Sequence, residues 1–223
     1  MRFSIIIPTL NEAPTITQAL QQLLNTIDPS QSVEIIVCDG GSRDDTQQLA
    51  QQFPLTLLSS PPGRARQMNT GARQASGEWL LFLHSDTRLP PLWMSAIASC
   101  NQPWGRFDLR LSGQHWLFRI IEKAINQRSR RTAVATGDQV LFFRRDFFQQ
   151  LDGFAEIPLM EDIAISKKAR RLAAPACLSQ QVITSSRRWE HNGILKTVLL
   201  MWLLRLAYWA GIKPDRLHRL YYS

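Results

Sequence analysis

Cysteine is scarce in this sequence: Cys38, Cys100 and Cys177 are the only three among 223 residues, and they lie far apart. No pair has the CxxC spacing of a zinc site or a thioredoxin-type redox motif, and an odd number argues against a disulfide framework. Internal repeats with a period of about 20–50 residues are also absent, which excludes solenoids and propellers.

Long apolar runs are absent as well. The first apolar run ends at Pro8, so we do not expect a signal peptide. The longest apolar stretch, residues 194–212, is interrupted by Lys196 and Arg205, whereas a membrane-spanning helix needs about 20 mainly apolar residues. We therefore expect a cytoplasmic protein, and peripheral attachment to the inner face of the membrane stays open.

Acidic side chains are outnumbered, because 26 Lys and Arg against 18 Asp and Glu give a net charge of +8. Residues 1–100 carry a net charge of −2, whereas residues 101–186 and 187–223 carry +5 each. Arg outnumbers Lys by 21 to 5, and its planar guanidinium matches phosphate oxygens. We therefore expect the second half to meet an anionic partner; small molecules, lipid headgroups and nucleic acid all stay open.

The composition, 44% hydrophobic and 20% charged, is typical of a globular protein and excludes general disorder. In the first hundred residues, apolar runs rich in β-branched residues alternate with stretches of helical periodicity. The runs are residues 3–7, 33–38, 55–58 and 79–83, and the helical stretches are residues 14–27, 44–53 and 64–75. This alternation predicts an α/β fold with a parallel sheet that carries helices on its faces.

The rest of the chain has a looser, α+β pattern. We expect strands at residues 106–111, 139–143 and 182–184 and helices at residues 93–99, 116–128, 161–172 and 194–210. A further helix should follow residue 143 and end at Gly153. No linker separates the two halves, so we expect one domain with a second lobe.

Polar motifs follow three of the predicted strands. They are Pro8-Thr9-Leu10-Asn11-Glu12, Asp39-Gly40-Gly41-Ser42-Arg43-Asp44 and His84-Ser85-Asp86-Thr87. Because parallel strands end at the same edge of a sheet, these motifs should line one binding crevice. The glycines after Asp39 match neither the GxGxxG fingerprint nor a P-loop. They let an anion approach the next helix, and a tight turn capped by Ser42 or Asp44 is equally open.

Two pairs of side chains near these strand ends have both a chemical and a structural interpretation. His84 and Asp86 point the same way on an extended chain, so they can converge on a metal-bound diphosphate. Alternatively, the strand ends in a simple turn and His84 is packed. Arg64 and Arg66 open a helix, where positive charge is unfavourable unless an anion lies nearby; two solvated arginines are the alternative.

The second half contributes further carboxylates. Glu161 and Asp162 begin a helix, where they either complement the helix dipole or accept a proton from an attacking hydroxyl. Asp138, between Gly137 and Gln139, offers a carboxylate beside an amide to a polyhydroxy ligand.

The C-terminal part is basic and aromatic. Arg187-Arg188-Trp189-Glu190-His191 combines phosphate donors, an aromatic platform and an imidazole, or forms a plain basic loop. The last predicted helix has an apolar seam that we expect to face the core or an interface: Leu195, Val198, Leu199, Trp202, Leu203, Leu206 and Trp209. Attachment to an anionic membrane is the alternative, given the surrounding Lys196, Arg205, Lys213, Arg216 and Arg219.

Four motifs together resemble family 2 glycosyltransferases of the GT-A fold. They are residues 5–12, residues 37–42, residues 82–86 and the pair Glu161-Asp162, in matching order along nearly the whole chain. The length and the stretch GRARQMN at residues 63–69 resemble a small, non-processive bacterial subgroup. The resemblance implies one domain over residues 1–223: a Rossmann-like, mostly parallel nucleotide-binding sheet at 1–100, an α+β acceptor and catalytic half at 101–192, and an amphipathic helix with a basic tail at 193–223.

The resemblance implies an inverting, metal-dependent hexosyltransferase that moves a sugar from a nucleotide-diphosphate sugar to an acceptor hydroxyl, with Asp162 as the general base. Asp86 and His191 would bind the divalent metal, Mn²⁺ or Mg²⁺. The nucleotide sugar would contact Pro8, Thr9, Asn11, Glu12, Asp39, Gly41, Ser42, Arg64, Arg66, Asn69, His84, Ser85, Asp86, Arg187 and Arg188. The acceptor, for which a lipid-linked molecule is open, would contact Gly137, Asp138, Gln139, Glu161 and Trp189.

The sequence departs from the family pattern at two positions. His84 stands where the family's DxD motif has its first Asp, which leaves the choice of metal open. Processive members carry QxxRW, whereas here Ser185 precedes Arg188-Trp189, so polymer synthesis is not expected.

Two other classes of function stay open. A nucleotidyltransferase could use a similar crevice and would release pyrophosphate. A protein that binds nucleic acid or an anionic membrane would explain the net charge. We do not expect nucleic acid as the partner, because Asp39, Asp86 and Asp162 would repel it.

Overall fold

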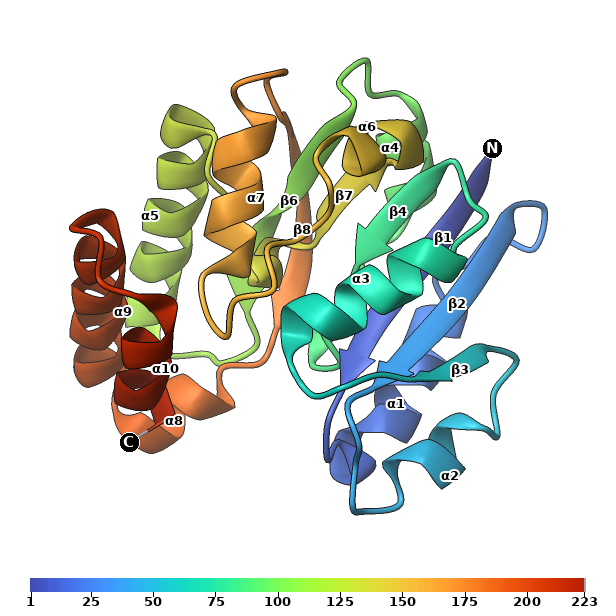
Figure 1. Ribbon diagram of the computed structural model, residues 1–223, viewed down its shortest axis with the longest axis horizontal. Helices are drawn as coiled ribbons and strands as arrows, with labels where there is room; N and C mark the ends of the chain where they lie inside the picture. Colours follow the sequence, from blue (N-terminus) through green and yellow to red (C-terminus); the bar gives the residue numbers. More distant parts are fainter. Residues whose placement is uncertain (223) are drawn as a thin grey trace.

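A computed structural model describes residues 1–222 and shows one mixed sheet with helices on both faces (Figure 1). The strand order across the sheet is β3-β2-β1-β4-β7-β6-β8-β5. The strands are β1 (Arg2–Thr9), β2 (Ser32–Asp39), β3 (Thr56–Ser59), β4 (Trp79–Phe82), β5 (Thr87–Arg88), β6 (Trp104–Leu111), β7 (Leu141–Arg144) and β8 (Ala176–Thr184). The predicted strands of the first half are all confirmed.

Helices connect these strands. They are α1 (Ala13–Leu24), α2 (Thr46–Ala50), α3 (Arg64–Gln74), α4 (Trp93–Ala98), α5 (Trp116–Thr132), the 3₁₀ helix η1 (Gly137–Gln139), α6 (Arg145–Gln150), α7 (Glu161–Ala169), α8 (Arg187–Asn192), α9 (Ile194–Trp209) and α10 (Pro214–Tyr222). Helix α2 is shorter than the predicted 44–53. It begins only at Thr46, because Asp44 lies before the helix, where its carboxylate accepts hydrogen bonds from the backbone N–H groups of Thr46 and Ala13.

Strands β3, β2, β1 and β4 are parallel neighbours. Thr9 is paired with Asp39, and Asp39 with Ser59, so the ends of three strands are level with one another. The polar motifs that follow β1 and β2 are therefore adjacent, as the sequence predicted.

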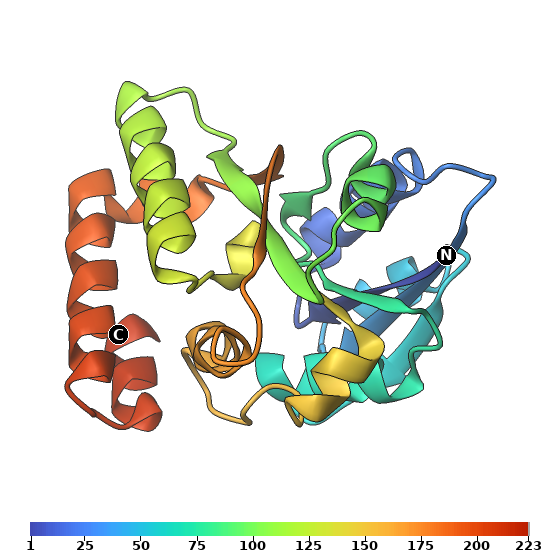
Figure 2. The same ribbon diagram turned by 90° about the horizontal axis from the view of Figure 1, so that it is seen from above.

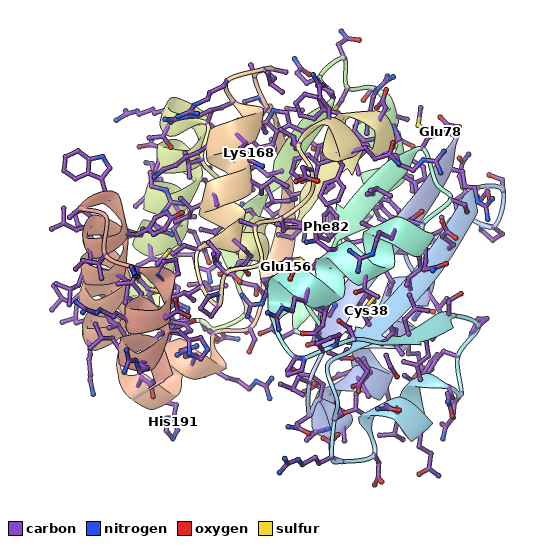
Figure 3. The ribbon with its side chains drawn as sticks, viewed as in Figure 1. Cys38, Glu78, Phe82, Glu156, Lys168 and His191 are labelled. Carbon is purple, nitrogen blue, oxygen red and sulfur yellow. The ribbon has the colours of Figure 1, made fainter. Side chains whose placement is uncertain are left out.

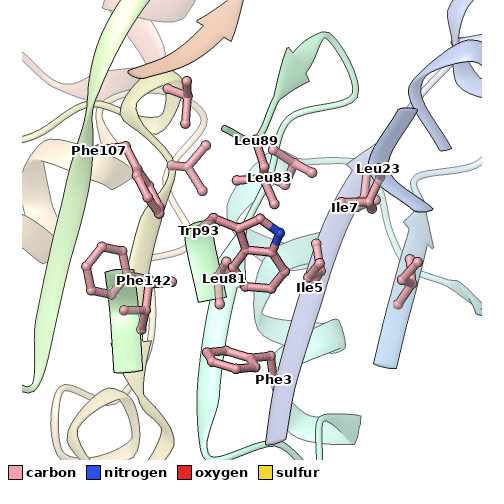
Figure 4. Packing of buried hydrophobic residues seen from close by; sticks show 14 of the residues in the cluster. Phe3, Ile5, Ile7, Leu23, Leu81, Leu83, Leu89, Trp93, Phe107 and Phe142 are labelled. Atoms are coloured by element: carbon pink, nitrogen blue, oxygen red, sulfur yellow. The ribbon is translucent and has the colours of Figure 1, made fainter. Parts of the chain in front are cut away.

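Alternation along β1 divides the core into two layers. Phe3, Ile5 and Ile7 pack on the side of α1 and α4, whereas Ile6 packs on the side of α3, α6 and α7. Figure 4 shows Trp93 of α4 at the centre of the first layer, beside the labelled strand residues. Because both faces are covered, the strands consist of nearly continuous apolar residues.

The second half joins the sheet through an antiparallel strand. Strand β7 is antiparallel to both β4 and β6, whereas β6 and β8 are parallel. The predicted strand at 182–184 is the end of the longer β8. Gln139, predicted to begin a strand, lies in η1 instead, because Thr136 and Gln139 exchange capping hydrogen bonds.

The C-terminal segment differs most from the prediction. Residues 187–191 are helical in α8 rather than a loop, and α9 is followed by α10 rather than ending the fold. Figures 1 and 2 both show α9 beside α5, at the opposite end of the molecule from β2. No helix within residues 1–222 is both long enough and apolar enough to cross a bilayer.

The apolar seam predicted on α9 does not face the core. Leu195, Leu199, Trp202, Leu203, Leu206 and Trp209 are exposed. The opposite side of the helix packs instead: Thr197 and Leu204 are buried, and Leu200, Ala207 and Tyr208 pack with Met160 and Ile163 of the α7 region and Leu217 of α10. The prediction of a core-facing seam was wrong, because α9 is apolar on both sides and the sequence pattern does not distinguish them.

Candidate active site

The Asp39 carboxylate organises the loop at the end of β2. Oδ1 accepts hydrogen bonds from the backbone N–H of Gly41 (3.0 Å) and Ser42 (2.9 Å) and from Gln47 Nε2 (2.7 Å), and Oδ2 accepts one from the Ser42 hydroxyl. Burial acts to raise the pKa of Asp39, but these hydrogen bonds together outweigh it and hold the pKa below its usual value. Gly41, with a φ of +91°, provides the turn. Asp39 is therefore an ionised, almost fully buried side chain that fixes the loop.

The loop after β1 is fastened to the loop after β2. The backbone N–H of Asn11 donates to Ser42 Oγ at 2.9 Å, and Asn11 Oδ1 accepts from the backbone N–H of Arg43 at 2.9 Å. The backbone N–H of Glu12 donates to Thr46 Oγ1 at 2.8 Å. The structure thus brings together Asn11, Glu12 and Ser42, which the sequence assigned to the nucleotide sugar.

Pro8 and Thr9, assigned to the same ligand, form the end of β1. They pair with Cys38 and Asp39 of β2, and the Thr9 hydroxyl lies 3.5 Å from Asp39 Oδ2.

Gln67 was not singled out from the sequence, yet it holds the same strand ends. Its buried amide donates to the carbonyls of Thr9 (2.7 Å) and Cys38 (2.8 Å). A Cβ on Gly40 would lie 3.0 Å from Gln67 Nε2, so glycine gives this amide its room. Gln67 lies in the GRARQMN stretch, directly after Arg66, and no feature of the sequence distinguished it from its neighbours.

His84 joins the two halves of the candidate site. Its Nδ1 lies 3.3 Å from Asp138 Oδ1, and a Cβ on Gly137 would lie 2.5 Å from the imidazole ring. Burial acts to raise the pKa of Asp138, but the hydrogen bond and charge of His84, with the charges of Arg64 and Arg188, lower it overall. His84 is therefore packed against the η1 segment rather than standing as a free ligand beside Asp86.

Gln139, one of the predicted acceptor residues, packs in the interior instead. It is fully buried, and its amide donates to Ser129 Oγ at 3.1 Å, so it packs η1 against α5.

The predicted metal ligands are not a preformed cage. Asp86 follows β4 with an exposed carboxylate, next to the buried Ser85. His191 lies at the outer end of α8, points away from the body of the protein (Figure 3), and has Nδ1 2.9 Å from Asn192 Oδ1. Among residues 1–222, no three His, Cys, Asp or Glu side chains gather as metal ligands. The structure gives no support to His191 as a ligand; a single carboxylate completed by phosphate oxygens still suits Mg²⁺ or Mn²⁺.

Asp162 begins α7 beside η1. Its Oδ2 accepts a hydrogen bond from the backbone N–H of Gly137 at 2.9 Å, and its Oδ1 accepts one from the N–H of Ile163 at 2.7 Å. Burial, followed by the negative charge of Glu161, raises the pKa of Asp162 to about 6, against the opposing effects of these hydrogen bonds and of Arg64. A carboxylate with this pKa is suited to accept a proton near neutral pH.

The residues of α3 divide between the site and the packing. Arg64 Nη1 lies 3.7 Å from Glu161 Oε1, so this arginine faces the carboxylates of α7. Arg66 Nε lies 3.2 Å from Glu156 Oε2, an ion pair on the surface that the sequence did not predict. Asn69 exchanges hydrogen bonds with the backbone of Phe154 at 2.8 and 2.9 Å and so anchors the turn before α7.

The basic residues of α8 have different surroundings. Arg188 donates to the carbonyl of Tyr221 at 2.9 Å, and its guanidinium lies 3.6 Å from the centre of the Tyr221 ring. Arg187 is exposed, with Nε 3.2 Å from Ser185 Oγ, and Trp189 is half-buried. Arg188 is thus positioned by α10, while its charge acts on Asp138.

Comparison with known proteins identifies related sequences. The profile of glycosyl transferase family 2 matches residues 4–150. The glycosyltransferase AglE of Haloferax volcanii is 33% identical over 98 residues, covering 41% of this chain and 32% of AglE. The poly(ribitol-phosphate) beta-N-acetylglucosaminyltransferase TarS of Staphylococcus aureus is 35% identical over 95 residues, covering 39% of this chain and 16% of TarS. The matched segment is about a third or less of either relative.

Solved structures have the same fold. TarS residues 1–349, in complex with UDP-GlcNAc, superimposes with a TM-score of 0.66 and 22% identity, covering 83% of this chain and 58% of that one. The mannosyltransferase PcManGT of Pyrobaculum calidifontis, in complex with GDP-Man and Mn²⁺, gives a TM-score of 0.63 and 22% identity, covering 82% and 56%. The predicted GT-A fold is confirmed. Because the family profile also covers more than half of its length, the chain belongs to glycosyl transferase family 2.

Proposed function

We propose that the protein transfers a hexosyl group from a nucleotide-diphosphate sugar to an acceptor hydroxyl, with inversion at the anomeric carbon. The observation that carries this proposal is Asp162: a carboxyl with a pKa of about 6, held by Gly137 and close to the arginine that opens α3. A carboxylate that only stabilised the start of a helix should have a lowered pKa, because the helix dipole favours its charged form. The raised pKa of Asp162 therefore favours a role in proton transfer.

The reaction proceeds in one displacement. Asp162 takes the proton of the acceptor hydroxyl while the hydroxyl oxygen forms a bond to the anomeric carbon on the face opposite the leaving group. The bond from that carbon to the phosphate oxygen breaks, and its electron pair leaves with the nucleoside diphosphate. Arg64 and Arg188, whose charges both lower the pKa of Asp138, are the residues that would stabilise the negative charge developing on the leaving diphosphate.

Asp86 is the residue that would hold a divalent metal, because its carboxylate is exposed after β4. When bound, Mn²⁺ or Mg²⁺ would supply positive charge to the diphosphate.

The nucleotide sugar is placed at the joined loops after β1 and β2. Thr9, Asn11 and Ser42 lie within one hydrogen-bonded unit that Asp39 and Gln67 fix, which supports a binding surface that needs little rearrangement when the ligand binds. The complexes of TarS with UDP-GlcNAc and of PcManGT with GDP-Man make uridine and guanosine nucleotides the first donors to test.

A thermal-shift screen of UDP, GDP and their sugars, each with and without Mn²⁺ or Mg²⁺, tests the proposal. We expect one nucleotide to raise the melting temperature in the presence of metal, by the equivalent of about 2.7 kcal/mol at a hundredfold excess over Kd. Asp86→Ala should lose the metal-dependent part, and Asp162→Asn should keep the shift but lose sugar transfer. Absence of any shift would refute the proposal, and pyrophosphate release would replace it with nucleotidyl transfer.

We also propose that the protein attaches peripherally to the cytoplasmic face of a membrane, where a lipid-linked acceptor would be within reach. Helix α9 is apolar on both sides, and such helices are normally covered on both. Its outer side is uncovered, with Trp202 and Trp209 exposed by 73% and 78%. The helix carries Lys196 and Arg205 and no acidic residue, so it is complementary to anionic lipids, whereas a second copy would bring like charges together.

Flotation with phosphatidylglycerol and phosphatidylcholine vesicles tests the attachment. We expect binding to the anionic vesicles that weakens as salt increases, because salt screens the charges. Leu199→Glu should abolish flotation, and Leu92→Glu should not, since Leu92 is equally exposed (75% against 70%) but lies at the start of α4. Flotation of the Leu199→Glu variant would refute the proposal. Dimers of the free protein that this substitution dissociates would identify a second copy as the partner instead.

A further inference from the structure

Arg128 of α5 has two guanidinium nitrogens that no hydrogen bond within residues 1–222 satisfies. Its Nε and Nη2 atoms are buried, and neither has an acceptor within residues 1–222. Two other arginines of the same helix are engaged: Arg119 donates to the carbonyl of Gly113 at 2.7 Å, and Arg130 donates to Asp108 at 2.6 Å. Buried donors are nearly always satisfied, and a buried charge is normally paired. Arg128 therefore has the features of a side chain whose partner is a ligand.

The charge of Arg128 interacts with that of the proposed base. Burial lowers the pKa of Arg128, and the negative charge of Asp162 opposes this effect. The positive charge of Arg106 lowers the pKa further. Figures 1 and 2 show α5 and α7 side by side. The guanidinium of Arg128 is therefore close enough to Asp162 for the two charges to interact.

Asp162 is neither a hydrogen-bond partner nor an ion-pair partner of Arg128. Its two oxygens accept hydrogen bonds from the backbone of Gly137 and Ile163, and no ion pair within 4.0 Å joins it to Arg128 in residues 1–222. The charge of Arg128 thus acts on the proposed proton acceptor, while its Nε and Nη2 have no hydrogen-bond partner within residues 1–222.

A third helix contributes Tyr208. The pKa of its phenol is raised, first by burial and then by the negative charge of Asp162, so the inner side of α9 also borders the base. Lys167 of α7 places its ammonium 4.9 Å from the centre of the Tyr208 ring. The charge of Asp162 therefore acts on an arginine of α5 and a phenol of α9, two side chains that can donate hydrogen bonds to an oxyanion.

We propose that Arg128 binds an anionic group of the acceptor, a phosphate or a carboxylate, and so places the acceptor hydroxyl beside Asp162. The two unpartnered nitrogens can donate to two oxygens of such a group at once, which fixes orientation as well as distance. This inference rests on the proposed function, and it specifies the acceptor as a hydroxyl compound that carries an oxyanion. A phosphorylated lipid and a small phosphorylated or carboxylic metabolite share this chemistry.

The test measures binding of inorganic phosphate to the full-length protein saturated with UDP and metal, so that the diphosphate site is filled. Arg128→Met, of similar length and without charge, should bind phosphate about ten- to hundredfold more weakly, since a hydrogen-bonded charge is removed. It should melt no lower than the wild type without phosphate, because an unpaired buried charge is lost. Arg131→Met is the matched control. Arg131 lies three residues further along α5 and is exposed, so this variant should bind phosphate normally.

Competition identifies the source of the anion. Displacement of phosphate by glycerol 3-phosphate points to a small acceptor, and displacement by phosphatidylglycerol vesicles to a lipid headgroup. Equal phosphate binding by the wild type and Arg128→Met, or no phosphate binding at all, would overturn the inference. Failure of UDP to bind in the same samples would instead count against the proposed function.

Discussion

Replacing Asp162 by Asn should abolish sugar transfer and at the same time stabilise the fold at neutral pH. Asn keeps an oxygen that accepts the hydrogen bond from Gly137, but it removes the charge. The pKa of Asp162 is raised from 3.8 to about 6, chiefly by burial, so the folded protein binds this proton more tightly than the unfolded chain. The favourable contribution is therefore complete below pH 3.8 and is lost as the pH rises through 6.

The magnitude follows from the shift. About two pKa units at 1.36 kcal/mol each correspond to a cost of roughly 3 kcal/mol for keeping Asp162 ionised in the fold at pH 8. For a domain of this size, 1 kcal/mol changes the melting temperature by about 2–4 °C. Relative to the wild type, Asp162→Asn should therefore gain roughly 6–12 °C between pH 4 and pH 8.

Urea unfolding or thermal melting at pH 4, 6 and 8 measures this difference. Asp146→Asn is the matched control, because Asp146 also accepts a hydrogen bond from the next backbone N–H at 2.7 Å but is exposed on the surface. Parallel pH profiles for Asp162→Asn and the wild type would show that Asp162 is not held in an unfavourable ionised state, and the argument for its role as base would fail.

Three further substitutions test how the site is held together. Gly137→Ala should destabilise the fold by about 1–3 kcal/mol, because its Cβ meets His84, and His84→Ala should relieve this in urea unfolding; strictly additive effects would contradict the clash. Asp39→Ala should cost about 1–3 kcal/mol at pH 7. Because the pKa of Asp39 is lowered, that contribution is present above pH 3.8 and disappears as the pH falls further, so a cost that is equally large in strong acid would refute it. Gln67→Ala should weaken nucleotide binding, measured by calorimetry, by removing the donors to Thr9 and Cys38; Gln74→Ala, at the far end of α3, is the control and should bind normally.

The first half of the fold could be predicted because its signals are local. Each strand of residues 1–100 is a short apolar run, and parallel strands joined by helices end at one edge, so the adjacency of Asn11 and Ser42 followed from the pattern. The partners of β6 and β8 could not be predicted in this way. Their pairing joins residues about 70 positions apart, for example Gly105 with Ala176, and no local pattern specifies that register.

The sequence motifs give candidate site residues, but not the side chains that hold them in place. Motifs indicated the strand-end loops and Asp162, whereas Gln67 and Arg128 depend on what surrounds them in space. The α9 seam shows the same limit: its two sides are equally apolar, and packing against Met160 and Leu217 decides which one is covered.

Under the proposed function, the contact between His84 and Asp138 implies a thermodynamic linkage between the two substrates. His84, after β4, belongs to the proposed donor site, and Asp138 of η1 belongs to the proposed acceptor site, so one pair of atoms 3.3 Å apart connects the two. Any preference that a bound donor imposes on this pair must change acceptor affinity, and the acceptor must change donor affinity by the same factor. Measuring the affinity of either ligand with and without the other would therefore determine a single coupling constant, and His84→Ala would bring it towards one.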